Sequence, residues 1–207
     1  VTALLRASND SAKIMCTQAF SNMLMHDKYR NELLEGELWW AITRLAKTDD
    51  EEILEAASRA LLDLTSVKET CLALREHHVV TFIQEIIRDH SEAFMSTCMR
   101  AVKNFIFYVP APFNLHELSS LLIIALSVIE QSKEINTLQI AHGVLLSVAM
   151  QNVNGVVQGF VDNHTVEILH NAREVWGTDS TCCKYTAQLL WQLSLHSYWT
   201  HNSPLHP

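Results

Sequence analysis

The feature that most constrains this chain is a helical pattern of apolar residues that recurs five times. Each copy is a five-residue segment whose fourth position is polar. The copies are Ala19–Met23, Ala60–Leu64, Ala101–Phe105, Val144–Val148 and Leu189–Leu193, and their first residues lie 41, 41, 43 and 45 positions apart. Repeats of about 40 to 47 residues are typical of helical solenoids. The spacing therefore predicts a stack of similar helical units.

Around each copy, apolar or small residues lie six, three and two positions before the polar position and one position after it. Offsets of three, four and seven place side chains on one face of a helix, so each copy is predicted to bury one stripe. Small members of the stripe allow a neighbouring helix to approach closely. The stripe consists of Ala57, Ala60, Leu61 and Leu64 in the second copy and of Cys98, Ala101, Val102 and Phe105 in the third.

A second recurring mark is a residue that tolerates positive φ after a short amphipathic segment. Gly36, His77 and Asn163 each occupy such a position. Gly, His and Asn all adopt left-handed backbone conformations more readily than most residues, so each is expected to end a short helix and reverse the chain. Each unit is therefore expected to hold one short helix and two longer ones.

In the first complete unit, the expected helices span residues 28 to 35, 37 to 47 and 49 to 66. The last of these opens with a capping box, in which the Thr48 side chain accepts from the backbone of Glu51. The acidic residues that follow suit the positive end of a helix dipole, so they are interpreted as structural.

Composition supports an all-α fold. The chain has 207 residues, of which 48% are hydrophobic and 18% are charged, with only 5 glycines and 4 prolines. Such a chain has enough apolar residues for a core and few of the residues that turn-rich β folds need. Pro110 and Pro112 open a linker without marking a domain boundary.

We expect one repeat domain over residues 1–197, followed by a loose C-terminal tail at 198–207. The domain is divided into units of roughly 1–26, 27–67, 68–109, 110–151 and 152–197.

Charge and cysteine usage narrow the classes of partner and compartment. The net charge is −8 and the pI is about 5.7, so no overall basic surface indicates a nucleic-acid partner. The five cysteines are odd in number, which favours free thiols in a reducing compartment. The longest apolar run, 121–128, is too short for a transmembrane segment. We expect a cytoplasmic protein, with nuclear and cytoskeleton-associated locations as alternatives.

The repeated unit resembles the armadillo repeat. Gly36–Ile42 is similar to that family's turn into its second helix, and Ala19–Met23 is similar to the signature of its third helix. The resemblance implies a right-handed superhelical solenoid of about four to five three-helix repeats, the first of them partial.

The resemblance also implies a concave groove lined by the third helices, where a ladder of asparagines holds an extended partner peptide by its backbone. Two of the five ladder positions keep the asparagine of the family. Those positions are Asn22, Asp63, Asn104, Ser147 and Gln192.

Nuclear-import adaptors of this family carry tryptophans four residues before the asparagines, where they hold cargo lysines. Here no tryptophan occupies those positions, which are Gln18, Arg59, Arg100, Gly143 and Gln188. Arg59, Arg100 and the nearby Lys103 would repel a lysine-rich cargo and attract an acidic one.

Each candidate site residue also has a plain structural interpretation. The ladder positions are equally compatible with a solvated helix face, and Arg59 is expected to pair with Asp63 four residues on. Arg100 has no acid at Asn104, which makes it the better candidate for partner binding. Trp191 is interpreted first as core packing, with an exposed binding hot spot as the alternative. At least one of Trp39 and Trp40 should fill the core.

No catalytic, cofactor or metal site is predicted. The sequence carries no phosphate-binding loop, dinucleotide fingerprint, zinc helix or nucleophile elbow. The adjacent pairs His77-His78 and Cys182-Cys183 do not have the spacing of metal ligands. The chain is therefore predicted not to be an enzyme.

The leading functional hypothesis is a protein-binding scaffold or adaptor that holds an extended or acidic segment of another protein in its concave groove. A cargo receptor of the nuclear transport type is an alternative, as is a regulatory or chaperone subunit of an enzyme or cytoskeletal motor. The oligomeric state is not predicted. The candidate partner-binding residues are Asn22, Arg59, Asp63, Arg100, Lys103, Asn104, Ser147, Gln188, Trp191 and Gln192.

Overall fold

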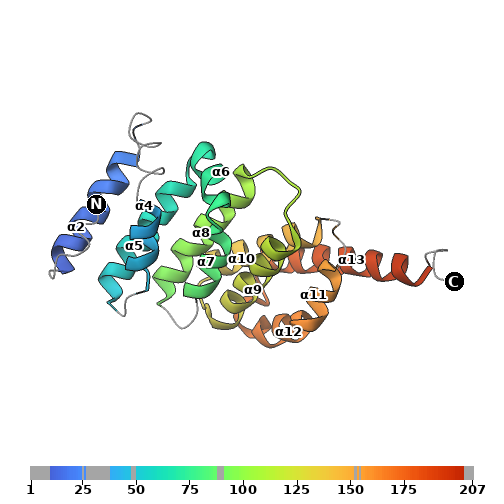
Figure 1. The fold of residues 1–207 in the computed structure, drawn as a ribbon. Coiled ribbons are helices and arrows are strands. Elements are labelled where there is room, and N and C mark those ends of the chain that lie inside the picture. The colour runs from blue at the N-terminus through green and yellow to red at the C-terminus, as the bar shows by residue number, and fades with distance from the viewer. Residues whose placement is uncertain are drawn as a thin grey trace. The chain divides into compact units, whose positions relative to one another are not determined.

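The fold was analysed on a computed structural model that describes residues 10–24, 26, 38–47, 50–87, 91–151, 153 and 155–202. These residues form α-helices joined by short connections, and no β-strand occurs among them (Figure 1). The helices group into two compact units, Val1–Pro110 and Ala111–Pro207.

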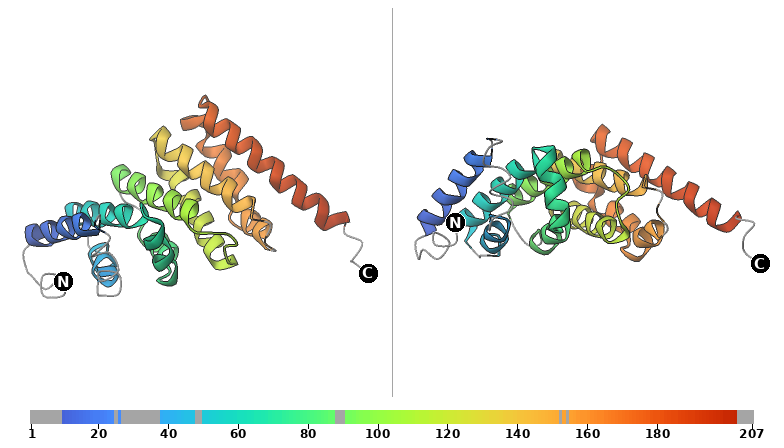
Figure 2. Two further views of the ribbon diagram at one scale, coloured as in Figure 1. Left: turned by 90° about the horizontal axis from the view of Figure 1, so that it is seen from above. Right: turned by 45° about the horizontal axis from the view of Figure 1, so that its top comes forward.

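In unit 1, one long helix packs between two others. The helices are α2 (Asp10–Leu24), α4 (Leu38–Leu45), α5 (Glu51–Thr65), α6 (Lys68–Glu76), α7 (Val79–Ile86) and α8 (Glu92–Tyr108). Helix α5 contacts both α2 and α8, and the three lie side by side in both views of Figure 2. The shorter helices α4 and α6 each contact α5, and α7 contacts α6.

In unit 2, α10 takes the central place. The helices are α9 (Leu115–Gln131), α10 (Ile135–Ala149), α11 (Val156–Asp162), α12 (Thr165–Trp176) and α13 (Ser180–Asn202). Helix α10 contacts α9 and α13, while α11 and α12 contact α9. At the connection between α12 and α13, the Gly177 backbone N–H donates to the Arg173 carbonyl at 2.7 Å. A Cβ at Gly177 would lie 2.6 Å from that oxygen, so the connection requires a glycine.

The predicted repeat is confirmed at the level of the helices. The five segments that define it lie in α2, α5, α8, α10 and α13. The predicted stripe of the second and third copies is buried in full, because all eight of its side chains are at most 1% exposed. The division between the units follows Pro110, at the predicted end of the third repeat unit. A single continuous domain over 1–197 remains a prediction.

The predicted three-helix unit is wrong for residues 110–151, which hold only two helices. Helix α9 runs unbroken for 17 residues in place of a short helix and a second helix. Its sequence contains no Gly or Asn at which the chain would reverse, its one histidine, His116, lies in the first turn, and ten of its residues are buried. A full capping box starts it, since the Asn114 side chain accepts from Glu117 N and the Glu117 side chain accepts from Asn114 N, each at 2.8 Å.

The chain reversals lie one residue later than predicted. His78 has φ 55° and His164 has φ 50°, whereas His77 and Asn163 have φ −92° and −94°. His77 and Asn163 are the C-caps of α6 and α11, and their backbone N–H groups still donate to helix carbonyls. The left-handed residue therefore falls directly after the cap. Gly36 lies outside the described residues.

Helix boundaries differ from the predicted ones by a few residues. The predicted 37–47 helix is Leu38–Leu45, and the predicted 49–66 helix is Glu51–Thr65. The N-cap of the latter is Asp50, whose carboxylate accepts from Glu52 N and Ile53 N at 3.0 and 3.1 Å. Thr48 and the predicted 28–35 helix lie outside the described residues.

The first residues of the predicted loose tail, 198–202, are helical and continue α13, which ends at Asn202. A loose tail over 198–207 stays a prediction. No proline or glycine interrupts the chain between Ser180 and Asn202, so no residue there breaks the helix. Residues 203–207 lie outside the described part of the chain.

Ala60→Leu tests the packing of α5. Ala60 is 1% exposed and belongs to the buried stripe of α5, the helix that packs between α2 and α8. A larger side chain should overpack this site and destabilise the fold by about 1 to 3 kcal/mol. Thermal and urea denaturation followed by circular dichroism measure this cost. An unchanged melting temperature would mean that Ala60 is not tightly packed, contrary to the structure.

Candidate protein-binding surface

Helix α8 presents a polar face with one exposed aromatic ring, which we call the α8 face. Its members are Arg100, Lys103, Asn104 and Phe107, which recur at helical spacing and point the same way. Arg100 and Lys103 are exposed, Asn104 is half-buried, and Phe107 is 78% exposed. Within the described part of the chain, neither cation takes part in a hydrogen bond or ion pair. The face therefore offers two uncompensated positive charges beside an amide and an apolar ring.

The opposite side of α8 holds it in place. Ala101, Val102 and Phe105 are buried and Cys98 is fully buried, so the helix is held through a stripe that excludes the α8 face. The α8 face is thus presented by a rigid element, and its residues contribute little to the core.

On α5, the predicted Arg59–Asp63 pair is wrong. Arg59 Nη2 donates to Glu55 Oε1 at 2.6 Å, one turn toward the N-terminus instead. An acid that precedes its base by four residues is the better-aligned arrangement on a helix. Both side chains are about half exposed or more, so the pair contributes little to stability. Its consequence is that Arg59 offers less positive charge to a partner than Arg100 does.

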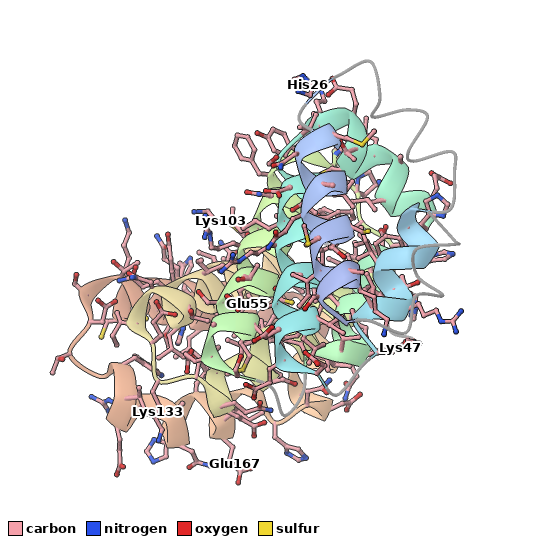
Figure 3. All side chains as sticks on the ribbon, turned by 90° about the vertical axis from the view of Figure 1, so that its left-hand side faces the viewer. His26, Lys47, Glu55, Lys103, Lys133 and Glu167 are labelled. Carbon is pink, nitrogen blue, oxygen red and sulfur yellow. The ribbon has the colours of Figure 1, made fainter. Side chains whose placement is uncertain are left out.

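The three ladder positions of unit 1 lie on helices that pack in series. Asn22 of α2 is exposed, and Asp63 of α5 is half-buried, as is Asn104 of α8. Figure 3 marks Glu55 of α5 and Lys103 of α8, which lie on the same side of unit 1 in that view. Along this side, α5 carries a compensated ion pair, whereas Arg100 and Lys103 of α8 have no ionic partner within the part of the chain that the structure describes.

The candidate residues of unit 2 lie on α10 and α13. The Ser147 hydroxyl donates to the Gly143 carbonyl at 2.8 Å, so it is used within its own helix. Gln188 is exposed and Gln192 is half-buried. Trp191 is 63% exposed, and its predicted core role is wrong. It lies two positions from Leu189, which is 1% exposed and buries the other side of α13.

The remaining tryptophans that the structure describes have packing roles. Trp39 is half-buried and contacts the Phe82 ring edge-on at a centroid distance of 5.2 Å, while His77 stacks on it at 6.2 Å. Trp176 ends α12 and is 5% exposed. The side chain of Trp40 lies outside the described residues.

A buried histidine, His142, lies in the core of unit 2. It is 1% exposed and its ring meets Trp176 edge-on at 4.8 Å. Nδ1 lies 2.7 Å from the Leu138 carbonyl, which can only accept, so Nδ1 carries the proton. Nε2 has no hydrogen-bond partner among the described residues. Burial lowers the pKa of His142, while the Leu138 carbonyl and the negative charge of Asp179 oppose this effect.

The free energy of unfolding should therefore decrease at acidic pH because of His142. A lowered pKa in the folded chain means that unfolded chains bind a proton more readily as the pH falls below the ordinary value of about 6.5. Folded chains lose stability from that pH downward, by about 1.4 kcal/mol for each unit by which the pKa is lowered. His142→Phe keeps a ring and removes the titration. Its melting temperature should depend less on pH than that of the unchanged chain between pH 6.5 and 5. Two parallel profiles would exclude His142 as the responsible group.

Asp179 has a structural role. Its carboxylate accepts from Cys182 N at 2.8 Å and from Gln139 Nε2 at 3.1 Å, so it caps α13 and ties it to α10. These hydrogen bonds lower the pKa of Asp179, with that from Cys182 N contributing most. The carboxylate is thus held ionised as a cap.

The buried thiols are poor nucleophiles. Burial raises the pKa of Cys71 and of Cys182 to about 12 and places that of Cys98 still further above its ordinary value. Cys71 Sγ also donates to the Thr65 carbonyl at 3.1 Å. All five cysteines are free thiols. A thiol must ionise to attack, so none of these three has the character of a catalytic cysteine.

The described residues contain neither a metal-binding cluster nor a membrane-spanning helix. No group of three or more His, Cys, Asp or Glu side chains lies close enough there to hold a metal ion. No helix in the described part of the chain is long and apolar enough to cross a membrane.

Phe107 was missed in the sequence analysis. A usable signal was present, because Phe107 lies three positions after Asn104 and four after Lys103, outside the apolar stripe. An aromatic residue on the polar side of an amphipathic helix is a candidate contact residue.

Comparison with known proteins defines the class of the fold. No protein-family model and no curated protein sequence matches the chain. Among solved structures, a designed armadillo repeat protein, YIII(Dq.V1)4CPAF in complex with the peptide (KR)4, superposes with a TM-score of 0.67 at 16% identity, over 92% of this chain and 79% of that one.

Two other engineered chains agree. Computationally designed armadillo repeat proteins for modular peptide recognition give a TM-score of 0.68 at 15% identity, over 92% of this chain and 79% of theirs. An engineered protein, structural genomics target OR329, gives 0.68 at 16% identity, over 93% of this chain and 77% of its own. The chain therefore has an armadillo-like repeat fold, and its class is that of the all-α solenoids.

Proposed function

We propose that this chain is a non-enzymatic protein-binding scaffold or adaptor that holds an extended acidic segment of a partner on the α8 face. The observation that carries the proposal is the grouping of Arg100 and Lys103, neither of which has an ionic partner among the described residues, with Asn104 and the exposed ring of Phe107. Arginine and aromatic side chains are enriched at protein interfaces.

Each member of the face has a distinct role toward such a segment. The Arg100 guanidinium forms paired hydrogen bonds with a carboxylate, and Lys103 adds a second positive charge. The Asn104 amide both donates to and accepts from the backbone of an extended chain. Phe107 packs against an apolar side chain of the partner and excludes water from the neighbouring charges.

The comparison with designed proteins supports protein binding in general. The peptide in the complex with (KR)4 has the opposite charge to the segment proposed here. The neighbour crystallised with (KR)4 holds a basic peptide. A basic segment would meet repulsion from Arg100 and Lys103, so the α8 face suits the opposite charge. The same repulsion disfavours a lysine-rich cargo of the nuclear-import type. The tryptophans with which import adaptors hold such a cargo are also absent from the corresponding positions of this sequence.

The regulatory or chaperone hypothesis places the contact on another surface. Trp191 favours it, because an aromatic side chain that is 63% exposed on α13 is a second candidate contact. In that role, loss of Trp191 would matter more than loss of the α8 face.

Two fluorescent peptides of equal length test the proposal. One alternates Glu with Gly and Ser around a single Phe, and the other replaces every Glu with Lys. Fluorescence anisotropy should show binding of the acidic peptide that weakens as salt rises, because exposed charges are screened within about 10 Å at 0.1 M salt. Equal binding of both peptides, or binding of the Lys peptide alone, would contradict an acidic partner.

A further inference from the structure

Unit 2 carries an open apolar groove that the proposed function does not use. Two adjoining hollows of about 730 and 340 Å³ lie along α12 and α13, and they share Val166, His170 and Leu190 as lining residues. Helix α11 closes one end with Phe160 and Val161. We call this surface the unit-2 groove.

The groove is lined by large apolar side chains that remain open to solvent. Val161 and Val166 are each 62% exposed, and Leu190 is 43% exposed. By contrast, α7 of unit 1, which like α12 precedes a long helix, buries both of its valines and both of its isoleucines. A continuous exposed apolar surface of this kind marks an interaction site more often than scattered single residues do.

The groove has the shape of a seat for a helix. On α13 its lining residues recur at intervals of three and four positions over three turns, or about 16 Å of helix. They are Cys183, Thr186, Ala187, Leu190, Leu193 and Ser194. Several of these are small, which lets a third helix approach closely while its larger side chains enter the space between α12 and α13.

Opposite charges stand toward the two ends of the groove. Glu167 lies in the first turn of α12 and Arg173 in its last turn. They are six positions apart in the sequence, which is about 9 Å along the helix axis. Within the described residues, neither side chain forms a hydrogen bond or ion pair. An occupant is therefore favoured if it brings a base to one end and an acid to the other.

We propose that the unit-2 groove binds an amphipathic helix of a partner protein, whose apolar stripe is flanked by an acid for Arg173 and a base for Glu167 about two turns apart. An extended segment fits less well, because no strand edge borders the groove among the described residues to pair with its backbone. An acyl chain fits less well because the groove is open along its length and charged toward both ends. This site is separate from the α8 face and does not depend on it.

Three labelled helical peptides test the charge pattern on the whole chain. They share one apolar stripe and carry, two turns apart, Glu and Lys, two Lys, or two Glu. The Glu/Lys peptide should bind at least tenfold more tightly than either of the others. Arg173→Glu should transfer this preference to the two-Lys peptide. Lys184→Glu changes the net charge equally at an exposed position outside the lining and should leave the preference unchanged.

The apolar contact is tested with two matched leucines of α13. Leu190→Asp should weaken binding of the Glu/Lys peptide more than tenfold, whereas Leu195→Asp should not. Leu195 is 36% exposed and does not line the groove. Circular dichroism confirms that both variants remain folded. The charges on the α8 face should not affect these results.

Three outcomes would overturn the proposal. The first is equal binding of all three peptides by the unchanged chain, and the second is full binding by Leu190→Asp. The third is self-association of the chain in sedimentation experiments that Leu190→Asp abolishes, because the occupant would then be a second copy. Loss of acidic-peptide binding at the α8 face, without these outcomes, would contradict the proposed function alone.

Discussion

Phe105→Ala is expected to lower the free energy of unfolding by about 3 to 5 kcal/mol, the usual cost of removing a buried phenyl ring. Phe105 is 1% exposed and lies in the stripe that buries α8. The cost combines lost transfer of apolar area from water with a cavity that the neighbouring helices fill only in part. Urea denaturation followed by circular dichroism measures it.

Phe107→Ala is the matched control for this result. The same substitution two positions along the same helix removes a ring that is 78% exposed. Its cost should remain within about 0.5 kcal/mol, as for most surface changes. Equal costs at the two positions would show that the register of α8 is wrong, and the α8 face would then lose its basis.

Arg100→Glu combined with Asn104→Ala is expected to weaken binding of an acidic segment by about 2 kcal/mol or more, which is roughly 30-fold in Kd. The change removes hydrogen bonds to a carboxylate and to the partner backbone, and it adds repulsion. Neither residue is part of the buried stripe, so the melting temperature should stay nearly unchanged.

Two controls separate this effect from simpler ones. Lys68→Glu alters the net charge by the same amount at an exposed position at the start of α6, and it should leave binding almost unchanged. Phe107→Ala should weaken binding and leave the free energy of unfolding almost unchanged. Phe105→Ala, in contrast, should lower the free energy of unfolding. If the double variant binds at full strength while folded, the partner contacts another surface, and the region around Trp191 becomes the first to test.

The buried side of each long helix could be predicted from sequence because burial is periodic. Ala60 and Phe105 were placed correctly since both lie at offsets that only a helix brings onto one face. Chain reversals were predicted to within one residue and no better. His77 is followed by His78, and Asn163 by His164, and both residue types, His and Asn, tolerate a left-handed conformation.

Other features depend on choices that the sequence leaves open. Arg59 has an acid four residues away on each side, Glu55 and Asp63, and it pairs with the one that precedes it. Trp191 could pack inward or outward until the position of α10 against α13 was known. The unit-2 groove was not predictable at all, because it is formed by the space between two helices and not by a pattern within either one.

Gly177 can affect the groove without lining it. A Cβ at this residue would clash with the Arg173 carbonyl, so a larger residue would disturb the last turn of α12. Arg173 lines the groove from that turn. A substitution at 177 can therefore weaken partner binding although every contacting residue keeps its identity.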